Sequence, residues 1–258
     1  MILKQKRIIG IVGGVGPMAG VSLHKAIINY TKTDGADQSH LEVHHLSRNV
    51  SDRTEYLLGK TSINPCQGAM NTTRALWLGA NSVGKKLVIG VPCITFHSPK
   101  IWVPFINNII NLYGTDVEII NMLHESIKDI QKDYPHVKRI GILCTTGTRN
   151  TNLYRNLLVS NNYDPIYVSD DIQEKVHRLI YHPVWGIKSV SSPVSSKAKY
   201  ILEEAVDALI KKDVDLILLG CTELPLAFDG VRMYKDTKIP LFDPIHSLAK
   251  SLIKKCVI

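Results

Sequence analysis

The chain has 258 residues, of which 45% are hydrophobic and 21% charged, a composition typical of a soluble globular protein with one large or two medium domains. Its formal net charge is +8, but the basic residues are not clustered with aromatic residues, which argues against a nucleic-acid-binding protein. No apolar run is long enough to span a membrane and the N-terminus lacks a signal-peptide pattern, so we expect neither nucleic acid nor membrane as a partner.

Apolar runs of strand length alternate with helical patterns along the whole chain. This alternation predicts an α/β fold in which parallel sheets are flanked by helices. The predicted strands lie near residues 7–12, 41–47, 86–92, 116–120, 139–144, 164–168, 214–219 and 239–242. The predicted helices lie near residues 17–31, 66–82, 99–112, 122–133, 148–160, 170–181, 195–212 and 244–255.

The two halves of the chain resemble each other. The segment KRIIGI at residues 6–11 is matched by KRIGIL at 138–143, and each is followed after similar distances by an apolar run that ends at a cysteine. Segment 226–258 is expected to return to the first half. We therefore predict two similar domains, one formed by residues 1–114 with 226–258 and the other by 115–225.

The two cysteines of the repeat are Cys93 and Cys221, and a threonine follows each of them closely, at Thr95 and Thr222. Either thiol alone is best interpreted as a buried structural cysteine. Two thiols at matching strand ends favour a reactive pair. A strand-to-helix turn would place each near a helix N-terminus, which lowers the pKa of a thiol.

The remaining cysteines, Cys66, Cys144 and Cys256, lack this context and are expected to be inert. The total of five is odd and includes no Cys-x-x-Cys pair, which argues against a disulfide framework and against a zinc site. We expect free thiols in a reducing cytoplasm. His97 could be a base or a metal ligand, but without a second ligand cluster we expect a helix-cap or pocket-wall residue and no metal.

A glycine-rich loop follows the first predicted strand. From Gly14 it fits the dinucleotide pattern Gly-x-Gly-x-x-Ala, but the second strand carries no acidic residue that could bind a ribose, so the signal for a nicotinamide cofactor is weak. A loop of this kind is better suited to bringing backbone N–H groups close to a small anionic ligand.

Several motifs together resemble the aspartate/glutamate racemase family, the cofactor-independent amino-acid racemases. They cover nearly the whole chain: IGIVGGVGPMA from residue 9, SDRTEYLLGK from 51, PCITFH from 92, GILCTTGT from 141, LGCTELP from 219 and Asp243-Pro244. The resemblance implies two α/β domains related by a pseudo-twofold axis, with the active site in the cleft between them, no cofactor, and often a homodimer.

The resemblance also implies roles for individual residues. Cys93 and Cys221 match the family's catalytic cysteines. Arg53 and Lys188, which composition and spacing alone do not single out, match residues that bind the side-chain carboxylate of aspartate. Thr95 and Thr222 match threonines close to the substrate α-carboxylate, and Thr145 falls in a Thr-Thr-Gly-Thr turn that borders the pocket.

The predicted activity is racemisation of an acidic amino acid, aspartate rather than glutamate, in which one thiolate takes the α-proton and the other thiol protonates the opposite face. Ile94 departs from the family, which usually has asparagine there, and it offers no hydrogen bond to the substrate's polar groups. Three alternatives stay open. A racemase of broad specificity is one of them, although Arg53 and Lys188 favour a substrate with a distal carboxylate. The other two change the reaction or remove it. One is another isomerase or lyase of the superfamily (hydantoin racemase, maleate isomerase or a decarboxylase), and the other is a non-catalytic ligand-binding relative.

Overall fold

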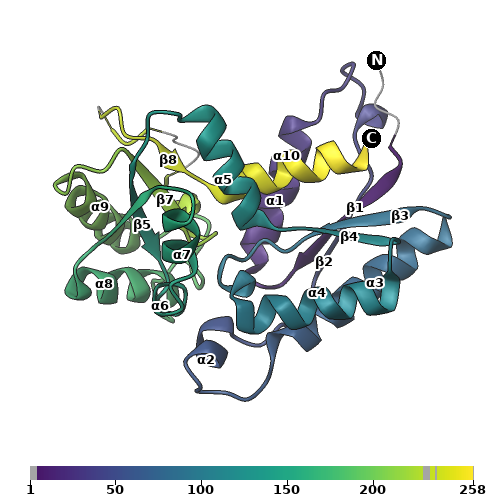
Figure 1. Cartoon of the computed structure of the whole chain (residues 1–258), viewed down its shortest axis with the longest axis horizontal. Coiled ribbons are helices and arrows are strands. Elements are labelled where there is room, and N and C mark those ends of the chain that lie inside the picture. Colours follow the sequence, from purple (N-terminus) through teal and green to yellow (C-terminus); the bar gives the residue numbers. More distant parts are fainter. Residues whose placement is uncertain (1–4, 229–232, 236, 258) are drawn as a thin grey trace. The chain divides into compact units, whose positions relative to one another are not determined.

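A computed structural model of the chain describes residues 5–228, 233–235 and 237–257 (Figure 1). The chain divides into two compact units, one formed by Met1–Ser126 with Ile245–Ile258 and the other by Ile127–Pro244. Residues 1–4 of the N-terminus and residues 229–232, 236 and 258 of the C-terminal segment lie outside the described residues. Each unit is built on its own parallel sheet.

The strands follow one another in chain order with a helix in most connections. The first sheet contains β1 (Arg7–Gly13), β2 (Val43–Ser47), β3 (Lys86–Gly90) and β4 (Val117–Ile120). The second contains β5 (Arg139–Cys144), β6 (Asp164–Tyr167), β7 (Leu216–Gly220) and β8 (Leu241–Phe242). All pairings are parallel, and the strand orders β2-β1-β3-β4 and β6-β5-β7-β8 are equivalent.

The α-helices of the first unit are α1 (Pro17–Tyr30), α2 (Arg53–Leu57), α3 (Pro65–Ser82), α4 (Pro99–Tyr113), α5 (Met122–Asp133, which continues into the second unit) and α10 (Pro244–Cys256, which begins at the last residue of the second). The second unit contains α6 (Thr146–Asn150), α7 (Leu153–Val159), α8 (Asp170–Tyr181) and α9 (Ser196–Ile210). Short 3₁₀ helices lie at Asp37–Ser39, Thr95–His97 and Leu224–Phe228.

Helices cover both faces of the first sheet. A side chain at Gly10 would meet Leu76 of α3, whereas one at Gly90 would meet Leu248 and Leu252 of α10. Gly10 pairs with Ile89 rather than with Gly90, so the two glycines face opposite sides of the sheet. The central strands are therefore buried on both faces, as their continuous apolar sequences predict.

The second sheet is covered in the same manner. A side chain at Gly141 would meet Leu209 of α9, and one at Gly220, on the opposite face, would meet Tyr154 of α7. Figure 1 shows α7 and α9 on the two sides of this sheet. The strands β5 and β7 are almost entirely buried. The predicted α/β class, with parallel sheets flanked by helices, is confirmed.

The structure differs from the sequence-based expectations in three places. The chain crosses between units near residues 126 and 244 rather than 114 and 225, because β4 pairs with β3 and β8 with β7. The single helix expected at 148–160 is split into α6 and α7, since Asn152 adopts a left-handed conformation (φ 51°). The helix α2 was not predicted at all.

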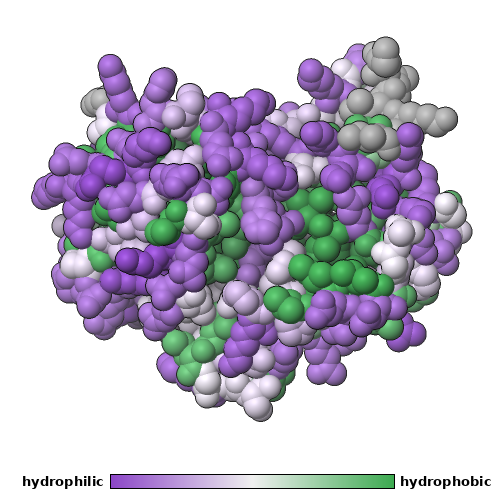
Figure 2. Space-filling model, in the orientation of Figure 1, coloured by the Kyte–Doolittle hydropathy of each residue, from purple (hydrophilic) through white to green (hydrophobic). Residues whose placement is uncertain are grey.

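Most of the face shown in Figure 2 is hydrophilic, in keeping with the charged composition. A hydrophobic patch lies over α4, whose exposed large hydrophobic residues are Val103, Ile110 and Leu112 (Figure 2). Among the helices of the described residues, none is both long and apolar enough to cross a membrane.

Candidate functional site

In the first unit, the candidate residues collect at the carboxyl edge of the sheet. Strands β1 and β3 are neighbours, with Ile11 opposite Gly90, and the glycine loop and Cys93 follow their ends. In parallel sheets this edge is where ligands bind, because the loops beyond it are open to substrate while the strands hold them in place. The topology therefore places Gly14 and Cys93 on neighbouring loops.

Cys93 lies in a tight turn and is only 6% exposed. Its backbone N–H donates to the Val91 carbonyl at 2.8 Å, and its own carbonyl accepts a hydrogen bond of 2.8 Å from Nδ1 of His97. Thr95 begins the 3₁₀ turn that follows and is buried. The loop that carries the thiol is therefore fixed through its backbone.

His97 acts as a structural residue of this loop. It is 3% exposed, donates through Nδ1 to Cys93, accepts a hydrogen bond through Nε2 from the Met122 N–H at 3.4 Å, and stacks on Trp102. Burial lowers its pKa to about 4, although the hydrogen bond to the Cys93 carbonyl acts in the opposite direction. The imidazole of His97 is therefore neutral and both of its nitrogens make hydrogen bonds, which agrees with the expected helix-cap or pocket-wall residue.

This burial predicts how stability depends on pH. Between pH 6.5 and about 4 the unfolded chain protonates His97 while the folded protein does not, so stability falls as the pH is lowered, by about 3 kcal/mol in total. In His97→Gln this contribution is absent. Urea unfolding at pH 7, 5.5 and 4 should show the stability difference between the two proteins shrinking toward low pH; a constant difference would contradict the buried, neutral histidine.

Arg53 is buried, at 6% exposure, although most arginines are solvated. It begins α2, which Asp52 caps by accepting a hydrogen bond from the Glu55 N–H at 2.8 Å. Its guanidinium donates to the carbonyls of Val50 (3.3 Å), Ser51 (3.2 Å) and Val15 (2.9 Å). Because α2 also packs against the 3₁₀ turn Thr95–His97, Arg53 joins the glycine loop to the region that follows Cys93.

Gly14 is required by the backbone. Its φ is +82°, and a side chain there would lie 1.7 Å from the carbonyl oxygen of Arg48. Only glycine fits a position with positive φ and this close approach. The loop is therefore held against the segment that follows β2.

In the second unit, Cys221 follows β7, the strand equivalent to β3, and Thr145 follows its neighbour β5. Cys144 lies opposite Gly220 in the register, so Thr145 and Cys221 leave the sheet at the same edge. Thr145 is buried and caps α6, its Oγ1 accepting from the Thr148 N–H at 3.2 Å. The structure thus brings these two predicted residues together.

The environment of Cys221 differs from the expectation. Its Sγ donates a 3.0 Å hydrogen bond to Oε2 of Glu223, and Oγ1 of Thr222 donates to the same oxygen at 3.2 Å. Burial raises the pKa of Cys221 well above its ordinary value, the negative charge of Glu223 adds to this, and the positive charge of Lys188 opposes it. The expected lowering of the Cys221 pKa is wrong, because the thiol is buried and because a carboxylate and a 3₁₀ helix follow the cysteine instead of an α-helix N-terminus.

Lys188 lies in the turn after α8 and is half-buried. Its N–H donates to the Ile180 carbonyl at 3.1 Å, and its ammonium lies 4.1 Å from the centre of the Tyr181 ring. Its charge acts on Cys221. Lys188 therefore belongs to the same electrostatic environment as the second thiol.

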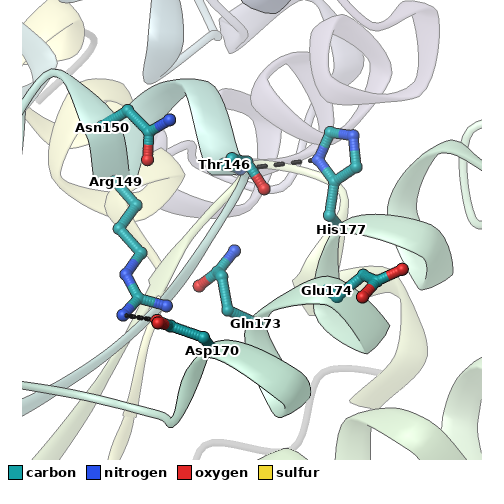
Figure 3. Close-up of a pocket in the computed structure, with 7 residues that line it drawn as sticks. All are labelled: Thr146, Arg149, Asn150, Asp170, Gln173, Glu174 and His177. Carbon is teal, nitrogen blue, oxygen red and sulfur yellow. Dashed lines mark hydrogen bonds and ion pairs between the residues drawn. The ribbon is translucent and has the colours of Figure 1, made fainter.

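A pocket of about 380 Å³ opens beside the Thr-Thr-Gly-Thr turn (Figure 3). It is lined by residues of α6 and α8: Thr146, Arg149, Asn150, Asp170, Gln173, Glu174 and His177. Arg149 is paired with Asp170 at 2.7 Å, and the Gln173 amide donates to the Cys144 carbonyl at 2.9 Å. None of the predicted site residues lines it, although Thr145 is adjacent in sequence.

The other cysteines are buried and free. Burial raises the pKa of Cys144 to about 12 and that of Cys256 to about 11, so both stay protonated thiols. Within the described part of the chain, no group of three His, Cys, Asp or Glu side chains could hold a metal ion.

Comparison with known proteins identifies relatives along most of the chain. The family model described as Asp/Glu/Hydantoin racemase matches residues 12–252. A glutamate racemase of Carboxydothermus hydrogenoformans is 25% identical over 206 residues, which are 78% of this chain and 69% of that protein.

Solved structures share the fold. An aspartate racemase of Picrophilus torridus has a TM-score of 0.73 and 24% identity, covering 97% of this chain and 94% of that one. A glutamate racemase of Francisella tularensis in complex with D-glutamate has a TM-score of 0.59 and 15% identity, covering 97% and 81%.

Proposed function

Because the chain belongs to the Asp/Glu/Hydantoin racemase family, we propose that this amino-acid racemase acts on an acidic substrate, aspartate rather than glutamate, without a cofactor. The observation that carries the proposal is the equivalent placement of Cys93 and Cys221, each following the third strand of a sheet with the same strand order. A two-base reaction needs two thiols, and each of the two similar units supplies one at the equivalent position.

The proposed reaction is a transfer of protons at the α-carbon. A thiolate removes the α-proton and becomes a thiol, the C–H electron pair stays on the substrate, and the second thiol donates its proton to the opposite face and becomes a thiolate. The configuration is inverted and the substrate is otherwise unchanged. In the reverse direction the thiols exchange roles.

The intermediate is a carbanion next to a carboxylate, so negative charge must be stabilised. The backbone N–H groups of the glycine loop and of the cysteine turns are suited to this, since they need no reorganisation during the reaction. We propose that Thr95, Thr145 and Thr222 lie near the α-carboxylate. Arg53 and Lys188 then bind the distal carboxylate through charge-assisted hydrogen bonds.

We propose aspartate because Arg53 and Lys188 can bind a distal carboxylate. Ile94 argues against tight binding of an amino acid, because asparagine is usual at this position in the family. Ile94 is 2% exposed and cannot hydrogen-bond to a substrate. A lost hydrogen bond to a charged group costs about 1.5–3 kcal/mol, which weakens such a site without abolishing it. The second candidate is therefore a hydantoin-type racemase that uses the same thiols, since the family includes hydantoin racemases.

We further propose a homodimer in a reducing compartment such as the cytoplasm. All five cysteines are free thiols, which suits reducing conditions. The exposed hydrophobic residues of α4 form the surface that we expect a second copy to cover. Sedimentation velocity would measure the mass in solution, and a monomer at micromolar concentration would contradict the dimer.

The function is tested by chiral chromatography after incubating the reduced protein with L-aspartate, L-glutamate or a hydantoin of one configuration, each separately. We expect D-aspartate to accumulate until the enantiomers are equal, and glutamate to react more slowly. Racemisation of the hydantoin alone would select the second candidate, and inversion of none of the three would contradict racemisation of these substrates.

A further inference from the structure

The two cysteine turns differ in charge. Cys93 is followed by Ile94 and Thr95, and the neutral His97 donates a hydrogen bond to its carbonyl. Cys221 is followed by Thr222 and Glu223, so a carboxylate occupies the position that corresponds to Thr95. Both cysteines are 6% exposed, so the two turns differ in the charge that follows the cysteine and not in the exposure of its side chain to solvent.

The contact between Cys221 and Glu223 fixes where a proton lies. An ionised carboxylate only accepts hydrogen bonds, so beside such a group the 3.0 Å contact from Sγ to Oε2 is a hydrogen bond only when the sulfur carries the proton. An ordinary carboxyl group loses its proton about four pH units below an ordinary thiol, so the proton stays on the thiol when the two share one.

The surroundings of Glu223 strengthen this effect. Glu223 is 4% exposed, and its Oε1 has no hydrogen-bond partner among the residues that the structure describes. Its charge is therefore poorly solvated, and a thiolate beside it would add a second negative charge. Lys188 also acts on Cys221, where its positive charge opposes the effect of Glu223. Cys221 in turn acts on Tyr154, and burial together with nearby negative groups raises the pKa of Tyr154 well above its ordinary value and keeps it neutral.

Resting on the proposed function, we infer that Glu223 is a positioning residue that keeps Cys221 protonated, so that in the resting enzyme Cys221 is the acid and Cys93 the base. The enzyme then meets one enantiomer with its thiols already in the correct protonation states. The other enantiomer requires the less stable form, in which the Cys221 thiolate faces Glu223.

The test measures each thiol directly. The full-length reduced protein is alkylated with iodoacetamide between pH 5 and 10, and the modification of Cys93 and Cys221 is followed separately by mass spectrometry of their peptides. In the protein without substitutions, we expect the pH midpoint of alkylation to be higher for Cys221 than for Cys93. A midpoint for Cys221 at or below that for Cys93 would overturn the inference, and this comparison needs no variant.

In Glu223→Gln, we expect the Cys221 midpoint to fall by about one pH unit or more, which makes its alkylation at pH 7 about tenfold faster, with Cys93 unchanged. Glu174→Gln, which changes an exposed glutamate of α8, is the matched control and should leave both midpoints in place. An unchanged Cys221 midpoint in Glu223→Gln would overturn the inference. Alkylation needs no substrate, so this outcome is separate from a failure of the proposed racemisation.

Discussion

Replacing either Cys93 or Cys221 with serine should lower the rate of aspartate racemisation about 10²–10⁴-fold, the usual contribution of a general acid or base. A serine hydroxyl has nearly the size of the thiol but is far less acidic, so it supplies no base at neutral pH. Chiral chromatography of product against time measures the loss, and circular dichroism checks that each variant is folded.

The matched control is Cys66→Ser. Cys66 is a buried thiol of the first unit at 5% exposure, close to that of Cys93, but it lies in α3 and accepts a hydrogen bond from Asn108. Its replacement should leave the racemisation rate within about twofold. A Cys221→Ser protein with full activity would exclude the two-base mechanism, because only one essential thiol would remain.

Replacing Arg53 with alanine should reduce kcat/KM for aspartate about 100-fold and reduce it much less for alanine, which has no distal carboxylate. Losing charge-assisted hydrogen bonds of about 1.5–3 kcal/mol each explains this size. The variant should also be less stable, because the carbonyls of Val15, Val50 and Ser51 lose their donor. Kinetics with both substrates and urea unfolding separate the two effects.

Arg48→Ala is the control, since Arg48 is an exposed arginine of the same unit with one long contact to the Asn71 carbonyl. It should change neither the substrate preference nor the stability appreciably. An equal fractional loss for aspartate and alanine in Arg53→Ala would show that Arg53 supports the fold of the loops and does not recognise the distal carboxylate.

Much of the fold followed from hydrophobic patterns because the central strands are buried on both faces. The strand Leu216–Gly220 is a continuous apolar run, and β3 is apolar after its first residue, Lys86. The alternation of such segments with helices leaves few other arrangements. The crossing points between units were harder to place. The strand β8 has only two residues, so its pairing with β7 leaves little pattern in the sequence.

The candidate site was less predictable, because its chemistry depends on contacts between side chains. Arg53 can be buried because its guanidinium donates hydrogen bonds to three backbone carbonyls, and no sequence pattern indicates these contacts. Glu223 was visible in the Gly-Cys-Thr-Glu motif, but its effect on Cys221 depends on a 3.0 Å contact and on the burial of its side chain. A helix N-terminus after the turn would lower the pKa of Cys221, but burial of the thiol, together with the adjacent carboxylate, raises it.

The most direct test of the two-thiol mechanism is proton NMR of L-aspartate in D₂O with the reduced protein. Removal of the α-proton and its replacement by deuterium from solvent should erase the α-proton signal, and the loss should require both Cys93 and Cys221. Persistence of that signal under conditions in which the protein is folded and its thiols are reduced would contradict α-proton abstraction from aspartate. It would direct attention to Ile94 and to the other substrates of the family.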